Sequence, residues 1–346
     1  MSQWRTLVHP DEALLILGSL HAFAQDRRLD RSEVRSMQVV LDGELRHISP
    51  FDAWGEWGVV SFAWDPERPG TAYVATGDEL LKVDLPERCV EDLGVRDLQD
   101  VHELTLTGQM LWIANTGRDE VVAFDVDRER VAGRVALSAY GSTPKVVHRP
   151  VEDEVPDRRL ATDVREESER FHCNQVLKGF DGHHYALVHY ALGDSRLIRR
   201  AAQRLMGRQG NGGVVDLDDG RVVPLGLMGP HTLRKVDGCY RVCDSGRSTI
   251  NVYDADWNPR GKILSKGWVR GADVSERLGI YYVGVSQFRR RYMALNPTAR
   301  QTPNMVQAIS LETGKPVGEL VLSGVERVTN VYVVPREVAA CLLELR

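Results

Sequence analysis

The sequence predicts an all-β fold, a six-bladed β-propeller that is closed by a C-terminal strand pairing with N-terminal strands. Short segments of alternating apolar and polar residues recur along the 346 residues and are separated by turns that contain glycine. These segments group into five units of four strands, and single strands are left over at both ends of the chain. Because a ring closed in this way has no free sheet edge, the leftover strands favour a sixth blade built from both termini.

Each unit begins with a strand, a turn and a second strand. The first strands alternate with period two, and the second strands are rich in β-branched and aromatic residues. Aligned on the turn glycine, the pairs are WGVVSFAWDPERPG before TAYVATG, VHELTLTG before QMLWIANTG, FHCNQVLKGFDG before HHYALVHYA, HTLRKVDG before CYRVCDSG, and RGADVSERLG before IYYVGVSQ.

A third and a fourth strand follow each pair. They are LLKVDL and CVEDLG, VVAFDVD and VAGRVALS, GGVVDLDDG and RVVPLGL, INVYDADW and GKILSKG, and VQAISLETG and PVGELVLSG. Third strands tend to end in an aspartate before a turn, at Asp84, Asp125, Asp216 and Asp254. Because aspartate side chains accept hydrogen bonds from turn backbones, we predict that these residues cap turns and bind no ligand.

The two ends of the chain supply the sixth blade. The C-terminal VTNVYVVP has the pattern of a first strand, and the N-terminal ALLILGSL, SMQVVLD and ELRHIS have the pattern of the three strands that should follow it. The alternative is a seven-bladed ring, in which the final AACLLEL pairs elsewhere. One helix is expected, in SRLIRRAAQRLMG, within an insertion.

Composition narrows the function classes. A chain of this length can bury one large core, and we expect a single domain over residues 1–346. The net charge of −5 gives no basic footprint for nucleic acid, and no apolar run is long enough to span a bilayer. Five scattered cysteines and the lack of a secretory leader predict a cytoplasmic protein with reduced thiols.

Three histidines occupy matching positions in successive units, His102, His172 and His231, each at the start of a first strand. Since first strands line the axis of a propeller, these side chains should converge on one mouth of the central channel. Second strands end on the same face, where His189 should stand behind His172. The other residues that we place at this mouth are Trp57, Asn115, Asp244, Arg270, Ser286 and Asn330.

Long insertions connect the strands on this same face. They cover residues 138–171, 191–212 and 287–305, and two of them are rich in arginine, including Arg289. An acidic protein that is basic around one pocket indicates a small anionic ligand, because arginine forks hold carboxylates and phosphates. The commoner fate of such a charge run is a solvated loop.

The segments HELTL, FHCNQV, GPHTLR, DSGRSTI, VRGADV, YVGVSQ and VYVVP resemble, in order and spacing, the motifs of a family of uncharacterised bacterial propeller proteins known as a domain of unknown function. The resemblance covers about residues 100–335. It implies the six-bladed fold and no known reaction. The chain departs from the family pattern at Thr232, Leu233 and His189. The site residues that the resemblance implies are His102, Glu103, His172, Asn174, His231, Arg270 and Ser286.

Three neutral imidazoles aimed at one volume suit a divalent metal such as zinc, iron, manganese, nickel or copper. We therefore predict a metal-dependent enzyme of lyase, isomerase or hydrolase type, acting on a small anionic metabolite. His102, His172 and His231 would bind the metal, and Asp244 would orient the ring of His231. Histidines at strand starts are also often just hydrogen-bonded to neighbouring backbone, which is the simpler interpretation.

The remaining roles follow from position in the strands. Glu103, Tyr190 and Arg270 are predicted to take part in catalysis, although strand alternation would turn Glu103 away from the axis if His102 faces it. The predicted substrate-binding residues are Trp57, Asn115, Asn174, His189, Ser286, Arg289 and Asn330. The alternative function is a non-catalytic propeller, either a small-molecule sensor or a platform for protein partners.

Overall fold

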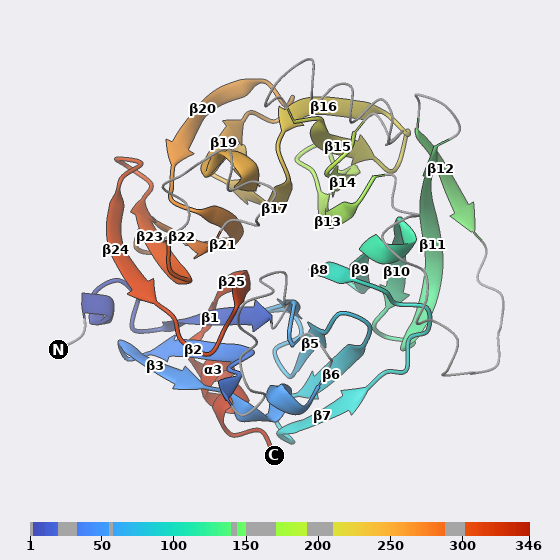
Figure 1. Ribbon diagram of the computed structural model, residues 1–346. Coiled ribbons are helices and arrows are strands. Elements are labelled where there is room, and N and C mark those ends of the chain that lie inside the picture. The colour runs from blue at the N-terminus through green and yellow to red at the C-terminus, as the bar shows by residue number, and fades with distance from the viewer. Residues whose placement is uncertain are drawn as a thin grey trace.

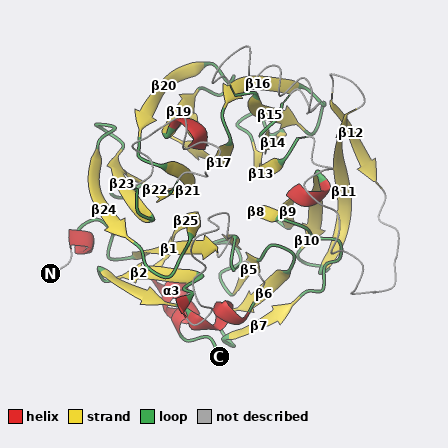
Figure 2. Ribbon diagram, in the orientation of Figure 1, coloured by secondary structure: helices red, strands yellow, loops and turns green. Residues whose placement is uncertain are grey.

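The computed structural model describes residues 3–19, 33–54, 58–139, 144–149, 171–191, 210–287 and 302–346. Within these ranges the strands form six sheets, five of four strands and one of five, arranged around a central axis (Figure 1). The chain is therefore a six-bladed β-propeller, as predicted. Figure 2 shows that strands make up the body of the molecule and that its helices are short.

We number the blades in chain order and give their strands from the axis outwards. Blade 1 consists of β4 (Ser61–Trp64), β5 (Thr71–Ala75), β6 (Leu80–Asp84) and β7 (Cys89–Asp92). Blade 2 consists of β8 (Val101–Thr107), β9 (Met110–Asn115), β10 (Glu120–Asp125), β11 (Arg130–Ala139) and β12 (Pro144–Arg149). Blade 3 consists of β13 (Cys173–Lys178), β14 (His184–Val188), β15 (Gly212–Asp216) and β16 (Val222–Leu227).

The remaining blades follow the same plan. Blade 4 consists of β17 (Pro230–Val236), β18 (Cys239–Asp244), β19 (Thr249–Tyr253) and β20 (Pro259–Leu264). Blade 5 consists of β21 (Trp268–Ser275), β22 (Ile280–Ser286), β23 (Met305–Ser310) and β24 (Pro316–Val321). The closing blade consists of β25 (Arg327–Pro335), β1 (Glu12–Ser19), β2 (Met37–Leu41) and β3 (Glu44–His47).

Short helices lie at the blade ends and near both termini. They are the 3-10 helices η1 (Gln3–Arg5), η3 (Ser49–Ala53), η4 (Thr116–Arg118) and η5 (Ser245–Arg247), and the α-helix α3 (Arg336–Leu343). No helix in the described ranges has both the length and the apolar character needed to cross a membrane. The helix expected at residues 198–206 lies outside the described residues, as do most of the insertions.

The closing blade confirms the predicted pairing of the two chain ends. β25 runs antiparallel to β1, from Glu12 opposite Pro335 to Ser19 opposite Arg327. The seven-blade alternative was wrong, because the segment that follows β25 is the helix α3 and not a strand. Its buried residues Val338, Ala339 and Leu342 have helical spacing, so one face of the helix packs against the core of the closing blade.

The apolar core lies between the blades. Val60 and Ala75 of blade 1 share one cluster with Val101 and Leu104 of blade 2, and the other neighbouring blades pack in the same manner. The outermost strands are mostly exposed, whereas β1, β10 and β22 are almost entirely buried. The outermost strand of blade 2, β12, falls inside the predicted insertion at 138–171 and adds a fifth strand that the sequence did not indicate.

The aspartates at the ends of third strands cap turns, as predicted. In all four turns Oδ1 of the aspartate accepts backbone N–H bonds from residues two to four positions further on. The donors are Glu87 for Asp84, Asp127 and Arg128 for Asp125, Asp218 and Asp219 for Asp216, and Asp256 and Asn258 for Asp254.

Candidate active site

First strands carry a β-bulge near their start in five successive blades. The pairing shifts between Val101 and Leu104, Cys173 and Gln175, His231 and Leu233, Val269 and Ala272, and Val328 and Asn330. A bulge inserts an extra residue and re-aims the side chains beside it. Side chains therefore do not simply alternate between the two faces of the strand at this end of the first strands. Figure 1 shows the first strands nearest the centre of the ring.

Four histidines form a ring of imidazoles at this mouth. The ring centroid of His102 lies 5.0 Å from that of His172, and His172 stacks on His189 at 4.2 Å. His189 lies 5.0 Å from His231, and His231 lies 6.1 Å from His102, which closes the ring. The structure thus brings the rings of the three predicted ligands together and places His189 between His172 and His231, but no three of these residues have ligand atoms that all lie within 4.8 Å of one another.

Hydrogen bonds fix which nitrogen of His102 carries the proton. The amide nitrogen of Asn174 donates to the carbonyl of Pro230 at 2.6 Å, so its Oδ1, which contacts Nδ1 of His102, must accept. Nδ1 therefore donates and Nε2 keeps a lone pair, 3.4 Å from a carboxylate oxygen of Asp100. Burial lowers the pKa of His102 to about 4, although the carboxylate of Asp100 opposes the shift and Arg270 only assists it, so the ring is neutral near pH 7.

His231 is oriented by the same logic. Its Nδ1 lies 3.0 Å from the carbonyl of Gly229 and 2.8 Å from Oγ of Ser245, whose hydroxyl donates to the carbonyl of Val269. Both neighbours accept, so Nδ1 donates and the buried Nε2 is the acceptor nitrogen. Ser245, and not the predicted Asp244, is thus the side chain that orients His231.

Asp244 and its counterpart Asn115 instead hold the loop that enters their own blade. Oδ1 of Asn115 accepts the N–H of Gln99 at 2.7 Å, and Oδ1 of Asp244 accepts the N–H of Met228 at 2.8 Å. Their other side-chain atoms bond Glu120 and Arg247. These contacts give both residues a structural role at the ends of β9 and β18, in place of the ligand-directed roles that the sequence suggested.

A charged network crosses the channel beyond the histidines. Oε1 of Glu103 on β8 lies 2.8 Å from Arg234 on β17, and Asp273 on β21 lies 3.9 Å from the same guanidinium. The guanidinium also lies 5.7 Å from the ring centre of Tyr332 on β25. Burial raises the pKa of Glu103 even though Arg234 opposes the shift. The bulge at His102 and Glu103 thus lets both side chains approach the axis region, which strand alternation had argued against.

Arg270 lies in the bulge of β21 and is only 5% exposed. In the part of the chain that the structure describes, its guanidinium makes no hydrogen bond or ion pair. Burial lowers its pKa, and the negative charges that act on it most are those of Asp100 and Glu103. Arg270 therefore lies in a first-strand bulge at the same end of the axis as the bulges that carry His102 and His231.

Several predicted substrate-binding residues join neighbouring blades instead. Asn174 bonds both His102 and the carbonyl of Pro230, Oγ of Ser286 accepts the N–H of Val328 at 2.9 Å, and Asn330 donates to the carbonyl of Val60 at 3.5 Å. Tyr190 follows His189, with the two ring centroids 6.0 Å apart. Trp57 and Arg289 lie outside the described residues.

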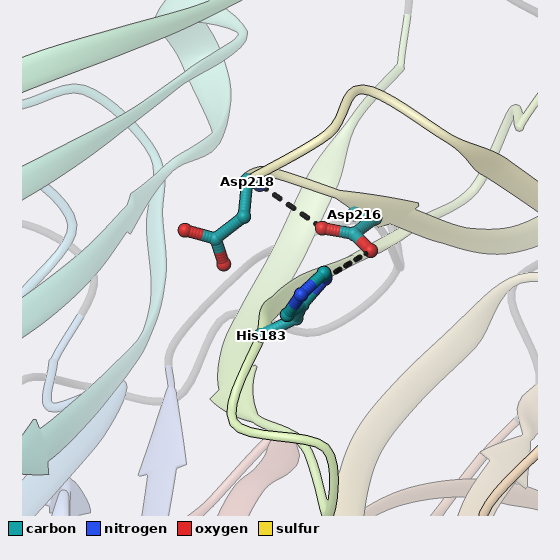
Figure 3. A group of neighbouring side chains, drawn as sticks. All are labelled: His183, Asp216 and Asp218. Carbon is teal, nitrogen blue, oxygen red and sulfur yellow. Dashed lines mark hydrogen bonds and ion pairs between the residues drawn. The ribbon is translucent and has the colours of Figure 1, made fainter.

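A second group of possible metal ligands lies at the opposite ends of the strands of blade 3. His183, Asp216 and Asp218 each offer one ligand atom within 4.8 Å of the others, and among the described residues this is the set that meets that criterion (Figure 3). Nδ1 of His183 lies 2.8 Å from Oδ2 of Asp216, and this contact raises the pKa of His183. The sequence pattern predicted a turn-capping role for Asp216 and no role for His183.

The contacts of this group are those of a capped turn. Oδ1 of Asp216 is occupied by the turn backbone, its Oδ2 pairs with His183, and Asp218 holds the N–H of His184 at 2.6 Å. The side chains of His183 and Asp218 are 43% and 47% exposed. The group could hold a metal ion, but Nδ1 of His183, both oxygens of Asp216 and Oδ2 of Asp218 already take part in hydrogen bonds.

Fold and site together define a class: a six-bladed propeller with a ring of four imidazoles, three of them on buried residues, and a buried arginine at one end of its axis. The model of a family described as Domain of unknown function (DUF4915) matches residues 169–343, just over half of the chain. The chain belongs to this family, which confirms the resemblance seen in the motifs.

Comparisons with other proteins support the fold alone. A comparison with curated proteins gave no match. Among solved structures, a protein of unknown function from Bacteroides caccae is similar with a TM-score of 0.55 and 11% identity, over 94% of this chain and 99% of that one. A chain of the nidogen/laminin complex is similar with a TM-score of 0.53 and 10% identity, over 93% and 98%.

Proposed function

We propose that the protein is a metal-dependent enzyme whose reaction centre is the imidazole ring at the mouth of the axis. The observation that carries this proposal is the fixed tautomer of His102 and His231. In both residues Nδ1 donates to an oxygen, which leaves Nε2 as the acceptor nitrogen. This is the arrangement by which proteins prepare histidines as metal ligands, since the second-nitrogen hydrogen bond fixes both ring orientation and proton position.

The chemistry of the donor set suits a borderline divalent metal. Neutral imidazoles bind zinc, iron, manganese, nickel or copper, and the depressed pKa of His102 keeps that ring neutral well below pH 7. A metal bound there would supply Lewis acidity for lyase, isomerase or hydrolase chemistry on a small anionic metabolite. The protein itself holds the rings: Asn174 and Ser245 orient two of them, and His172 and His189 stack between these.

The experiment is elemental mass spectrometry of tag-free protein, before and after reconstitution with zinc, iron, manganese, nickel and copper. The parent should hold close to one metal per chain. A folded triple variant, His102→Ala/His172→Ala/His231→Ala, should hold none, while the control His183→Ala should keep the metal of the parent.

Two results would contradict this proposal. Loss of metal in His183→Ala, with retention in the triple variant, would move the metal to the turn of blade 3 and refute the mouth as reaction centre. Absence of metal from the reconstituted parent would refute the metalloenzyme and favour the non-catalytic propeller.

A further inference from the structure

We propose that Arg270 is the anion-binding group of this mouth, and that the ligand presents a carboxylate or phosphate oxyanion to its guanidinium. The inference deepens the proposed function by naming the recognised group, and it rests on that proposal only in placing the ligand at the same mouth. It assigns anion recognition to the rigid scaffold, whereas the sequence suggested the arginine-rich insertions.

The first argument is the electrostatic state of Arg270. A guanidinium has five N–H donors in a planar fork, and burying it without hydrogen-bond partners is costly. Arg270 is only 5% exposed. Within the described ranges no hydrogen bond or ion pair satisfies its donors. Such an arrangement is expected where a ligand completes the hydrogen bonding, because protein interiors otherwise pair their charges.

The contrast with Arg234 strengthens the point. Arg234 lies three residues beyond His231 on its first strand, and it is paired with Glu103 at 2.8 Å and approached by Asp273. The two arginines therefore share the axis region but differ in their partners. Arg234 is a member of a satisfied network, whereas Arg270 is a buried cation without a hydrogen bond or ion pair in the described part of the chain.

The backbone at Arg270 is held in place by close contacts with the neighbouring strands. The next residue, Gly271, has φ 73°, and a Cβ on it would lie 2.3 Å from Cα of Asn330. Its N–H donates to Oγ1 of Thr232 at 2.9 Å, which ties the bulge of β21 to the first strand of blade 4. A Cβ on Gly284 would meet the carbonyl of Arg270 itself at 2.4 Å. A binding group held this firmly loses little freedom when the ligand arrives.

The chemistry of the fork defines the ligand class. Carboxylates and phosphates offer two oxygens in the spacing that guanidinium matches, and charge-assisted bonds of this kind are about twice as strong as neutral ones. Arg270 lies in the bulge at the start of β21, and His231 and His102 lie in the corresponding bulges of β17 and β8. The oxyanion would therefore lie next to the imidazole ring, with the reacting part of the molecule over the histidines.

The test uses calorimetric titration of chelator-treated, tag-free protein at low salt with two probes, inorganic phosphate and succinate. The parent should bind at least one of them, and which one it binds identifies the oxyanion. Arg270→Gln should weaken that binding at least about tenfold, and Arg270→Lys should weaken it less. The matched control is Arg247→Gln, which removes one positive charge beside η5, where Arg247 is paired with Asp244.

Thermal unfolding without ligand shows whether Arg270→Gln is still folded. Because Arg270 has no partner among the described residues, Arg270→Gln should unfold at the temperature of the parent or above it. The proposal is overturned if the parent binds neither probe, if Arg270→Gln binds as well as the parent, or if Arg247→Gln loses as much affinity. Metal content is measured on the same variants before chelator treatment. If Arg270→Gln keeps the metal of the parent but loses anion binding, the anion site is separate from the metal site. If the histidine triple variant loses anion binding while Arg270→Gln keeps it, the role of Arg270 is refuted.

Discussion

At the level of single residues, the end of the second strand decides how the neighbouring histidine is oriented. Thr116 of blade 2 and Ser245 of blade 4 occupy matching positions, in NTGR and DSGR, and each hydroxyl donates to a carbonyl of the next blade. Only Ser245 also contacts a histidine ring. The repeated motif was visible in the sequence, but nothing in it showed that one hydroxyl would reach His231.

This pair of hydroxyls gives a matched test of the metal proposal. Ser245→Ala should lower metal affinity about 10- to 100-fold, because Nδ1 of His231 loses one of the two acceptors that fix its tautomer. Thr116→Ala should leave metal affinity unchanged. Both variants lose one inter-blade hydrogen bond, so both should lose about 1 kcal/mol in urea unfolding. Equal metal affinity in the two variants would argue against an orienting role for Ser245.

At the level of elements, the bulges of the first strands determine which way the side chains of the site face. Strand alternation predicted that His102 and Glu103 would face opposite ways, and the bulge after Val101 removes that constraint. The same irregularity recurs in blades 3, 4 and 5, which supply the other histidines and Arg270. Bulges leave little trace in a sequence because they are one extra residue in a pattern of period two.

The bulge of β21 predicts that one added methyl group has a large effect on the free energy of unfolding. Gly271→Ala should destabilise the protein by roughly 3 kcal/mol or more. Residue 271 has a left-handed φ, and a Cβ there would meet backbone atoms of β25 that cannot move aside. Gly261→Ala on the outer strand β20 is the control, since a Cβ there meets nothing within 4 Å. Its free energy of unfolding, from urea titration, should stay within about 0.5 kcal/mol of the parent. A mild effect of Gly271→Ala would show that β21 and β25 can separate.

At the level of the whole molecule, side-chain bonds join neighbouring first strands around the axis. Ser61 accepts the N–H of Leu104, Gln175 exchanges two bonds with Leu233, and Thr329 donates to the carbonyl of Val59. With the bonds of Asn174, Thr232 and Ser286 they link every pair of adjacent blades. The mouth therefore rests on a closed frame whose geometry depends on all six blades.

The charge network across the axis gives a test at this scale. Arg234→Met should destabilise the protein by about 3 to 5 kcal/mol, because it leaves Glu103 buried without its cation. The double variant Glu103→Gln/Arg234→Met should recover part of this loss, since no carboxylate is then left unpaired there. Urea unfolding of the two single variants and the double variant measures the coupling energy. Additive losses would mean that the pair across the channel contributes nothing as a pair.

The sequence by itself determined the number of blades, the closure by both chain ends, the turn aspartates and the convergence of three histidines. These features follow from period-two patterns and turn residues, which are local, and from the symmetry of a closed ring, which repeats them. Tertiary structure alone decided that α3 is a helix and not a seventh blade, that Ser245 orients His231, and that Arg270 is buried without a partner among the described residues while Arg234 is paired. Those outcomes depend on contacts between strands from different blades, and such contacts are set by bulges and packing that no local pattern encodes.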